Sequence, residues 1–157
     1  MGLDMYLSKK HYVQKWNHQP KNEQFDVAVK KGDDDYNFIN PEKVKYIEEE
    51  IGYWRKANHI HKWFVENVQD GIDECQESHV GIGDLKSLLC LCKEVLENRD
   101  KAPSLLPTQC GFFFGDTQYD EYYFGSIEHT VRILESILND VSEDGYLPYE
   151  VYYSSSW

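Results

Sequence analysis

The sequence predicts an α+β fold in a single domain over residues 1–157, in which a small, mostly antiparallel sheet includes both chain ends and three to four helices cover it. At the start of the chain, Leu3, Met5 and Leu7 alternate with polar or tyrosine residues, and near the end Val151 and Tyr153 alternate around Tyr152. Such alternation is typical of half-buried strands. Between the two ends, apolar residues recur at helical spacing, and no repeat or linker divides the chain.

The segments that follow the first strand predict a hairpin and then a long helix. Residues 25–29 alternate, the turn-like KKGDDD follows, and residues 36–39 are apolar again. Asn40, Pro41 and Glu42 then resemble a helix start, with a cap, a first-turn proline and an acidic residue. We expect one helix from about residue 41 to 68, and because its apolar stripe changes phase at Gly52, the helix is either kinked there or packed against two neighbours.

Two further helices are predicted, at residues 84–98 and 121–139, each with apolar residues along one face. A loop with two prolines and two glycines separates them, and Pro148 makes the start of the last strand irregular. The residues expected to face inward are Leu85, Leu88, Leu89, Cys92, Val95 and Leu96 in the first of these helices, and Ile127, Leu134, Ile137 and Leu138 in the second.

The charge balance excludes several classes of partner. With 28 acidic against 16 basic residues, the net charge is −12, and no basic run is long enough to neutralise a phosphate backbone or anionic lipid. We therefore expect no direct nucleic-acid binding and no membrane binding. The short acidic clusters are typical of solvated faces, although an acidic surface that imitates nucleic-acid phosphates is the alternative. No apolar run suits a membrane span and the start lacks a secretion signal, which predicts a cytoplasmic protein.

Four cysteines give no sign of a metal site. Cys90 and Cys92 are close in sequence, but two positions on a helix are about 200° apart, so their sulfurs diverge. Together with Cys75 and Cys110 they are expected to be reduced packing residues. His59 and His61 also point in different directions on a helix. We expect no metal and no cofactor.

The segment GYWRKANHIHKWF, residues 52–64, contains the first group of candidate binding residues. On the predicted helix, Tyr53 lies in the core, Asn58 and His61 fall on the apolar side near Trp54, and Arg55 lies on the outer arc with His59. Buried polar side chains need partners. They form either an internal polar network or the lining of a pocket, in which tryptophan stacks on a planar ring and Arg55 or Lys56 meets a phosphate.

The second group lies in LLPTQCGFFFGDTQYDEYY, residues 105–123. Three consecutive phenylalanines fit neither a helix nor a strand, and glycines on both sides let the backbone turn tightly. The loop either caps the core or forms the second wall of a cleft beside residues 53–64. The candidate ligand-binding residues are Trp54, Arg55, Lys56, Asn58, His61, Gln109, Phe113 and Tyr119.

These two segments, with GLDMYL at the start and YYSSSW at the end, resemble a family of small, functionally uncharacterised proteins encoded by tailed phages and prophages. The resemblance spans nearly the whole chain. It implies that the protein acts in the cytoplasm of an infected bacterium. It also implies that Trp54, Arg55, Lys56, Asn58, His61 and Trp63 belong to one signature block and residues 107–115 to another.

Three functions remain open from the sequence. The favoured one is a non-enzymatic protein that captures a small nucleotide-like ligand, such as a host immune signal. The alternatives are an inhibitor that binds a host protein through an acidic or aromatic surface, and a small nucleotide-processing enzyme. No catalytic motif is recognised, and His61 with Asp120 or Glu121 is the one acid–base pairing considered. A homo-oligomer is compatible with all three.

Overall fold

A four-stranded antiparallel sheet brings the two ends of the chain together in the computed structural model, which describes residues 2–157. Its strands are β1 (Asp4–Tyr12), β4 (Tyr46–Arg55), β5 (Ser78–His79) and β6 (Glu150–Ser156), in the order β4-β1-β6-β5. Along β1 and β6, Leu7 lies opposite Tyr153. The predicted α+β class and the pairing of the first and last strands are confirmed.

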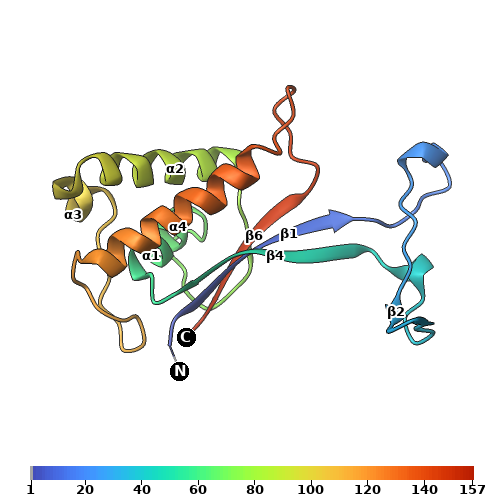
Figure 1. Ribbon diagram of the computed structural model, residues 1–157, viewed down its shortest axis with the longest axis horizontal. Coiled ribbons are helices and arrows are strands. Elements are labelled where there is room, and N and C mark those ends of the chain that lie inside the picture. The colour runs from blue at the N-terminus through green and yellow to red at the C-terminus, as the bar shows by residue number, and fades with distance from the viewer. Residues whose placement is uncertain (1) are drawn as a thin grey trace.

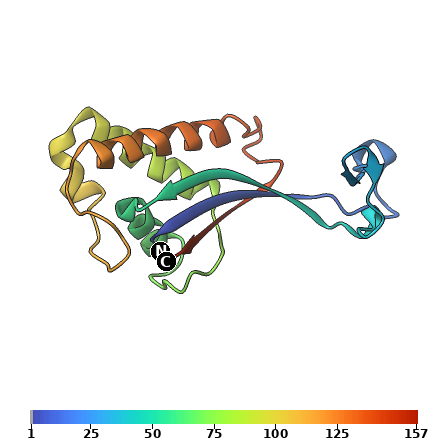
Figure 2. The same ribbon diagram turned by 60° about the horizontal axis from the view of Figure 1, so that its bottom comes forward.

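The helices gather on one face of the sheet, at the end where both termini lie (Figures 1 and 2). They are α1 (Asn58–Asn67), α2 (Ile82–Glu97), the short α3 (Ala102–Leu105) and α4 (Glu121–Leu138), with a 3-10 turn at Arg99–Lys101. Apolar side chains of β1 and β6 pack beneath α1, α2 and α4 in one core. Its largest fully buried members include Tyr153, Phe64, Leu3, Met5, Leu7, Ile60, Leu85, Leu88, Leu106, Ile127 and Leu134.

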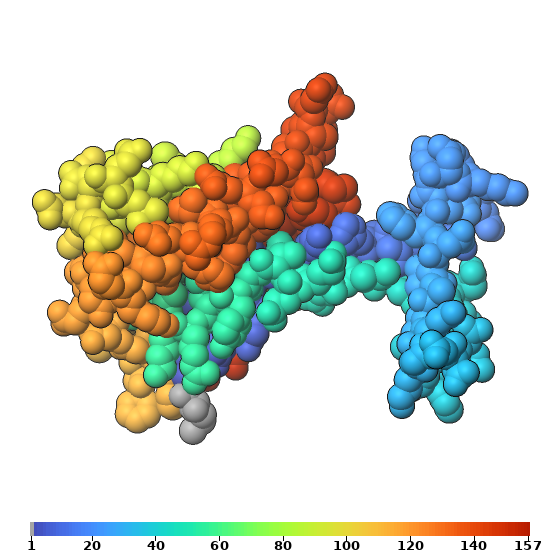
Figure 3. Space-filling view, in the orientation of Figure 1, coloured from blue at the N-terminus to red at the C-terminus, as the bar shows by residue number. Residues whose placement is uncertain are grey.

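Beyond this body, β1 and β4 continue as a two-stranded arm that holds a separate small lobe at its far end (Figures 1 and 3). We call residues 12–47 the distal lobe and the rest of the described chain, including the arm, the body. The lobe contains 3-10 turns at Lys21–Glu23 and Pro41–Lys43 and the strands β2 (Lys30–Lys31) and β3 (Asp34–Asp35). The predicted hairpin therefore exists at its turn, but residues 25–29 and 36–39 do not form its strands.

The predicted helix over residues 41–52 is wrong, because this segment is mostly strand. Asn40 does accept a hydrogen bond from the amide of Glu42, but the helical structure ends at Lys43 after one 3-10 turn. Strand β4 then pairs with β1, so that Lys9 lies opposite Glu49 and Lys10 opposite Glu48. The Lys9 Nζ is 3.1 Å from Glu49 Oε2. The strand ladder with β1, in which lysines face two of the glutamates, thus overrides their helix preference.

Gly52 does not kink a helix but sits in the middle of β4. A β-carbon at this position would come within 3.1 Å of the Ile133 side chain on α4 and of the Trp54 ring. The phase change in the apolar pattern therefore marks the passage from strand to helix. Glycine is needed there because α4 crosses closely over the sheet.

Candidate functional site

The first group of candidate residues lies on a turn that joins β4 to α1. Trp54 and Arg55 end the strand, Lys56 adopts a positive φ of 56°, and Asn58 begins the helix. The Lys56 amide donates to the Leu3 carbonyl over 2.7 Å, which fixes the turn against β1. Because the chain is not one continuous helix, neighbours on the predicted helical wheel separate. Tyr53, expected in the core, is 39% exposed, and His59, expected outside, is 3% exposed.

Asn58 ties the loop that contains Gln109 and Phe113 to α1. Its side chain is 1% exposed, and its Nδ2 donates to the carbonyls of Phe114 at 3.0 Å and Asp116 at 2.8 Å. Its Oδ1 accepts from the Gln109 amide at 2.9 Å. Three of the four hydrogen bonds that an asparagine side chain can make are thus used within the protein. This contact supports the internal-network interpretation of Asn58.

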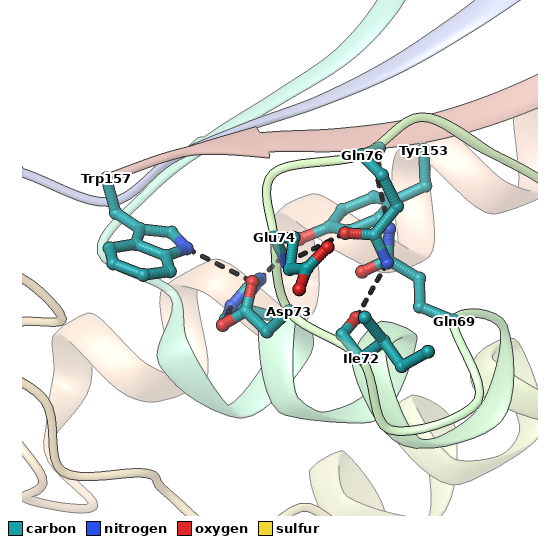
Figure 4. A network of polar contacts seen from close by, with 8 residues as sticks. Gln69, Ile72, Asp73, Glu74, Gln76, Tyr153 and Trp157 are labelled. Carbon is teal, nitrogen blue, oxygen red and sulfur yellow. Dashed lines mark hydrogen bonds and ion pairs between the residues drawn. The ribbon is translucent and has the colours of Figure 1, made fainter.

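The buried His61 belongs to a second polar network, with Tyr153, Asp73 and Trp157. Figure 4 shows these three partners beside the C-terminal strand. His61 Nδ1 is 2.8 Å from the Tyr153 hydroxyl and its Nε2 is 3.0 Å from Asp73 Oδ2. The indole of Trp157 donates to the other Asp73 oxygen at 3.1 Å. The network therefore joins α1, the loop after it and the C-terminal strand.

The acidic partners considered for His61 in the sequence are engaged elsewhere. Asp120 caps α4 by accepting from the Tyr123 amide at 3.0 Å, and Glu121 pairs with Arg99 at 2.7 Å. The carboxylate that meets His61 comes from Asp73 instead. No helical spacing pointed to this contact, because Asp73 reaches His61 only after the chain has turned back from the end of α1.

The phenylalanine run divides its rings between three environments. Phe114 is 7% exposed in the core, Phe113 is half-buried and Phe112 is 96% exposed. A β-carbon on Gly111 would lie 2.6 Å from the Phe114 ring, so only glycine lets this ring turn inward. The Phe113 carbonyl accepts from the Leu3 amide at 3.0 Å. The loop therefore caps the core next to the N-terminal strand.

A pocket of about 410 Å³ opens on the other side of the turn, between the end of β4 and helix α4. We call it the β4–α4 pocket. It includes Trp54 and Arg55 from the predicted set, whereas Lys56, Asn58, His61, Gln109, Phe113 and Tyr119 do not line it. The lining residues are Tyr53, Trp54, Arg55, Ala57, Glu121, Tyr122, Gly125, Ser126 and His129.

The α4 wall of this pocket was missed in the sequence, although a signal was present. Tyr122, Gly125, Ser126 and His129 recur at spacings of three and four, which places them on one face of a helix. A β-carbon on Gly125 would meet no atom within 4 Å. A glycine inside a helix costs about 1 kcal/mol relative to alanine, and here the absent side chain leaves space in the pocket.

Two side chains of α4 also satisfy the free edge of β4. The Tyr122 hydroxyl donates to the Arg55 carbonyl at 2.5 Å, and His129 Nε2 donates to the Tyr53 carbonyl at 3.0 Å. An uncovered strand edge invites pairing with another strand. These bonds close the edge in the body, and they fix the two walls of the pocket relative to each other.

The charges around the pocket favour at most one anionic group. Among residues 2–157, Arg55 is the only lysine or arginine in the lining, and its guanidinium lies 3.7 Å from Asp4. The Tyr53 hydroxyl donates to Asp4 at 2.5 Å, and this hydrogen bond raises the Tyr53 pKa. The carboxylate of Glu121 stands at the opposite wall. A ligand with several phosphates would meet two acids and one already engaged base.

Ser126 in the pocket lining and the buried His59 form a nucleophile-like pair, with Oγ and Nε2 2.9 Å apart. Ser126 donates its proton to the Tyr123 carbonyl at 2.7 Å, so His59 must donate to the serine oxygen. Burial lowers the pKa of His59 to about 3, which makes it a poor proton acceptor. The pair therefore has the geometry of helix packing rather than of a base that activates a serine.

Three other features bear on the type of site. Cys92 is buried while Cys90 is exposed, so their sulfurs diverge on α2 as the helical pattern predicts, and all four cysteines are free. Within residues 2–157, no three histidine, cysteine or acidic side chains converge as metal ligands would. None of the helices in this range is both long and apolar enough to cross a bilayer.

Comparison of the chain with protein-family models, with curated protein sequences and with solved structures gives no match.

Proposed function

We propose that the protein binds a small planar ligand of nucleoside size in the β4–α4 pocket. The observation that carries this proposal is the pocket itself, of about 410 Å³, with three aromatic residues in its lining and a helical glycine that leaves space. Ligand sites are commonly of a few hundred cubic ångströms, with apolar walls and a few polar groups. Tyr53, Trp54 and Tyr122 supply the apolar walls, and Ser126 and His129 supply polar atoms.

The charges narrow the ligand to a nucleobase, a nucleoside or a nucleoside monophosphate. Aromatic side chains stack on any base, because every base has a π-face. One exposed arginine can meet a single phosphate, and the nearby acids oppose a second. The resemblance to phage-encoded proteins supports a setting in which such a ligand is a host signalling molecule that the protein captures.

The pocket can be tested by filling it from Gly125. Gly125→Leu places a side chain in the open space, and leucine also suits the helix. Gly83→Leu is the matched control, because Gly83 is an exposed glycine on α2 whose β-carbon would likewise meet nothing within 4 Å. We expect calorimetric titration with nucleobases, nucleosides and nucleoside monophosphates to show binding that Gly125→Leu abolishes and Gly83→Leu preserves.

Arg55→Ala separates the two parts of the ligand. It should weaken binding of a monophosphate by about 1.5 to 3 kcal/mol and leave binding of the corresponding nucleoside nearly unchanged. Stability should also change little, since the Arg55 side chain is 55% exposed. Absence of binding to every member of the panel, or equal loss with both leucine variants, would contradict the proposal.

A further inference from the structure

The distal lobe exposes an unusual concentration of large apolar side chains. Within the part of the chain that the structure describes, half of the exposed large hydrophobic residues lie between positions 12 and 47, whereas Val13 is the one buried hydrophobic residue in that range. Among those of the lobe, Phe38 is the most exposed, at 89%. The set consists of Tyr12, Trp16, Phe25, Phe38, Ile39, Tyr46 and Ile47.

Secondary structure within the lobe is too short to repay the cost of ordering it. Apart from the ends of β1 and β4 where the arm enters, its regular structure is a hairpin of β2 and β3 with two residues in each strand and two single 3-10 turns. Isolated two-stranded hairpins are marginal in water, and each ordered residue costs about 1–2 kcal/mol of backbone entropy. Burial of apolar surface must offset this cost, and within one chain little such burial occurs. Its exposed apolar side chains therefore indicate a surface that binds a partner.

Charge distinguishes the lobe from the rest of the molecule. Residues 12–47 contain six lysines and six acidic residues, whereas the remainder contains ten basic and twenty-two acidic residues. The lobe is therefore neutral, and the whole net charge of −12 belongs to the rest of the chain. Two copies of the protein repel each other through their bodies. They meet with the least repulsion through their lobes, because each lobe stands at the far end of the arm, away from the helices (Figure 3).

The lobe also presents charges that suit a second copy of itself. On the hairpin, Lys30 lies opposite Asp35 and Lys31 opposite Asp34, and all four residues are exposed. Among residues 2–157, none of these four side chains takes part in an ion pair. A surface with both signs side by side can pair with its own two-fold copy, because each lysine can meet the other copy's aspartate.

Strand pairing through the free edge of β4 is a poor alternative. The arm portion of β4 includes Glu48, Glu49 and Glu50, all exposed. Two antiparallel copies of this edge would bring like charges together, a common way for proteins to prevent edge association. Contact between copies should therefore form through side chains of the lobe.

We propose that the distal lobe is a self-association surface, on which a second copy of the chain buries the exposed aromatic and aliphatic side chains. The resulting dimer is joined lobe to lobe, with the two acidic bodies at its outer ends. It leaves the β4–α4 pocket of each copy open, since that pocket lies in the body. The inference is independent of what the pocket binds.

Sedimentation velocity of the full chain from about 1 to 100 µM tests this proposal. We expect a dimer whose fraction rises with concentration, and Phe38→Ser should raise its dissociation constant about tenfold or more. Phe112→Ser is the matched control, because Phe112 is 96% exposed on a loop of the body. It should leave the dissociation constant unchanged.

Two outcomes would overturn the proposal. One is a monomer at every concentration, which would assign the exposed surface to a different protein. The other is dissociation of the dimer by Phe112→Ser but not by Phe38→Ser, which would place the contact on the body. Far-ultraviolet circular dichroism should be the same for both variants, because neither side chain contributes to the core.

Discussion

The body and the distal lobe are made from similar residues but bury them very differently. Six of the chain's aromatic side chains lie in residues 12–47, a share close to that segment's share of the length. In the body, the rings of Phe64 on α1 and Tyr153 on β6 stack between helix and sheet, with centroids 4.0 Å apart. In the lobe, Tyr36 and Phe38 pair at 5.5 Å, yet Phe38 remains 89% exposed. Aromatic content alone therefore does not produce a core, which requires elements long enough to enclose the rings.

Polar side chains show the same contrast. In the body, Asn58 and His61 are buried and each has more than one partner. In the lobe, the salt bridges of Lys15 with Asp26 and Glu42 lie at the surface, where such pairs contribute at most about 1 kcal/mol. Loss of these buried hydrogen bonds would therefore lower the stability of the body, whereas loss of the surface salt bridges would change the stability of the lobe little.

The largest difference is expected from the same substitution made in each region. Phe64→Ala removes a fully buried ring and should lower the free energy of unfolding by about 3 to 5 kcal/mol. Phe38→Ala should change it by no more than about 0.5 kcal/mol. Urea unfolding at a concentration well below that at which copies associate measures both values. Similar losses for the two variants would show that the lobe contains a core of its own.

A second test removes buried hydrogen bonds from the body, so that the loop over residues 108–117 is held as weakly as the lobe. In Asn58→Asp, an oxygen replaces the Nδ2 that donates to the carbonyls of Phe114 and Asp116, so the loop loses its two bonds and meets repulsion instead. We expect a loss of about 2 to 3 kcal/mol and faster amide hydrogen exchange over residues 108–117.

Asn67→Asp is the control for this change. Asn67 lies on the same helix and also donates to a carbonyl, that of Trp63, but it is exposed. Its exchange pattern in the 108–117 loop should match the unaltered protein. If both variants loosen the loop equally, the effect comes from added charge on α1 and not from the loss of the Asn58 contacts.

Much of the body could be predicted from the sequence because its elements carry their own periodicity. The strands at both ends and the helices α2 and α4 show clear apolar patterns, and their positions agree with the structure within a few residues, except that β1 continues to Tyr12. The stretch from residue 41 to 57 could not be assigned in this way. Its glutamates are exposed on a two-stranded arm, so no buried face imposes alternation.

The candidate site was only partly predictable for a related reason. Trp54 and Arg55 were predicted because they lie in a segment rich in aromatic and basic residues. The wall opposite them belongs to α4, which is far away in sequence. The assumed helix from Tyr53 to His61 placed Asn58 and His61 beside Trp54, whereas the turn at Lys56 directs them to different networks. A one-residue change of backbone conformation is enough to separate side chains that a helical wheel groups together.

The pH dependence of stability allows a third, smaller comparison, between the buried His59 of the body and the exposed His18 of the lobe. Burial lowers the pKa of His59 from its ordinary value of 6.5 to about 3. Between these values the unfolded chain binds a proton that the folded chain excludes, so stability falls as the pH is lowered, by about 1.4 kcal/mol per unit. The full slope is reached only below the unfolded pKa of 6.5, so urea unfolding at pH 7 and pH 5 should differ by about 2 kcal/mol from this group.

Two histidine variants identify its source. His59→Phe keeps the packing against Tyr123, whose ring centroid is 4.1 Å away, and should reduce the slope by the contribution of this group. His18→Phe alters an exposed histidine of the lobe and should leave the slope as it is. An unaltered slope in His59→Phe would assign the pH dependence to other groups.

The smallest loss should follow the most extensive change, replacement of residues 14–44 by Asn-Gly. Val13 donates to the Lys45 carbonyl at 2.8 Å, so the two strands of the arm are already adjacent where the new turn would join them. Asn-Gly suits such a two-residue connection. Because the body makes its core without the lobe, its free energy of unfolding should stay the same or rise by up to about 2 kcal/mol, as the closed loop becomes shorter. The shortened chain should also remain monomeric and bind the same small ligands as the full chain. A loss of more than about 2 kcal/mol would mean that the lobe supports the body, and the contrast between the two regions would then fail.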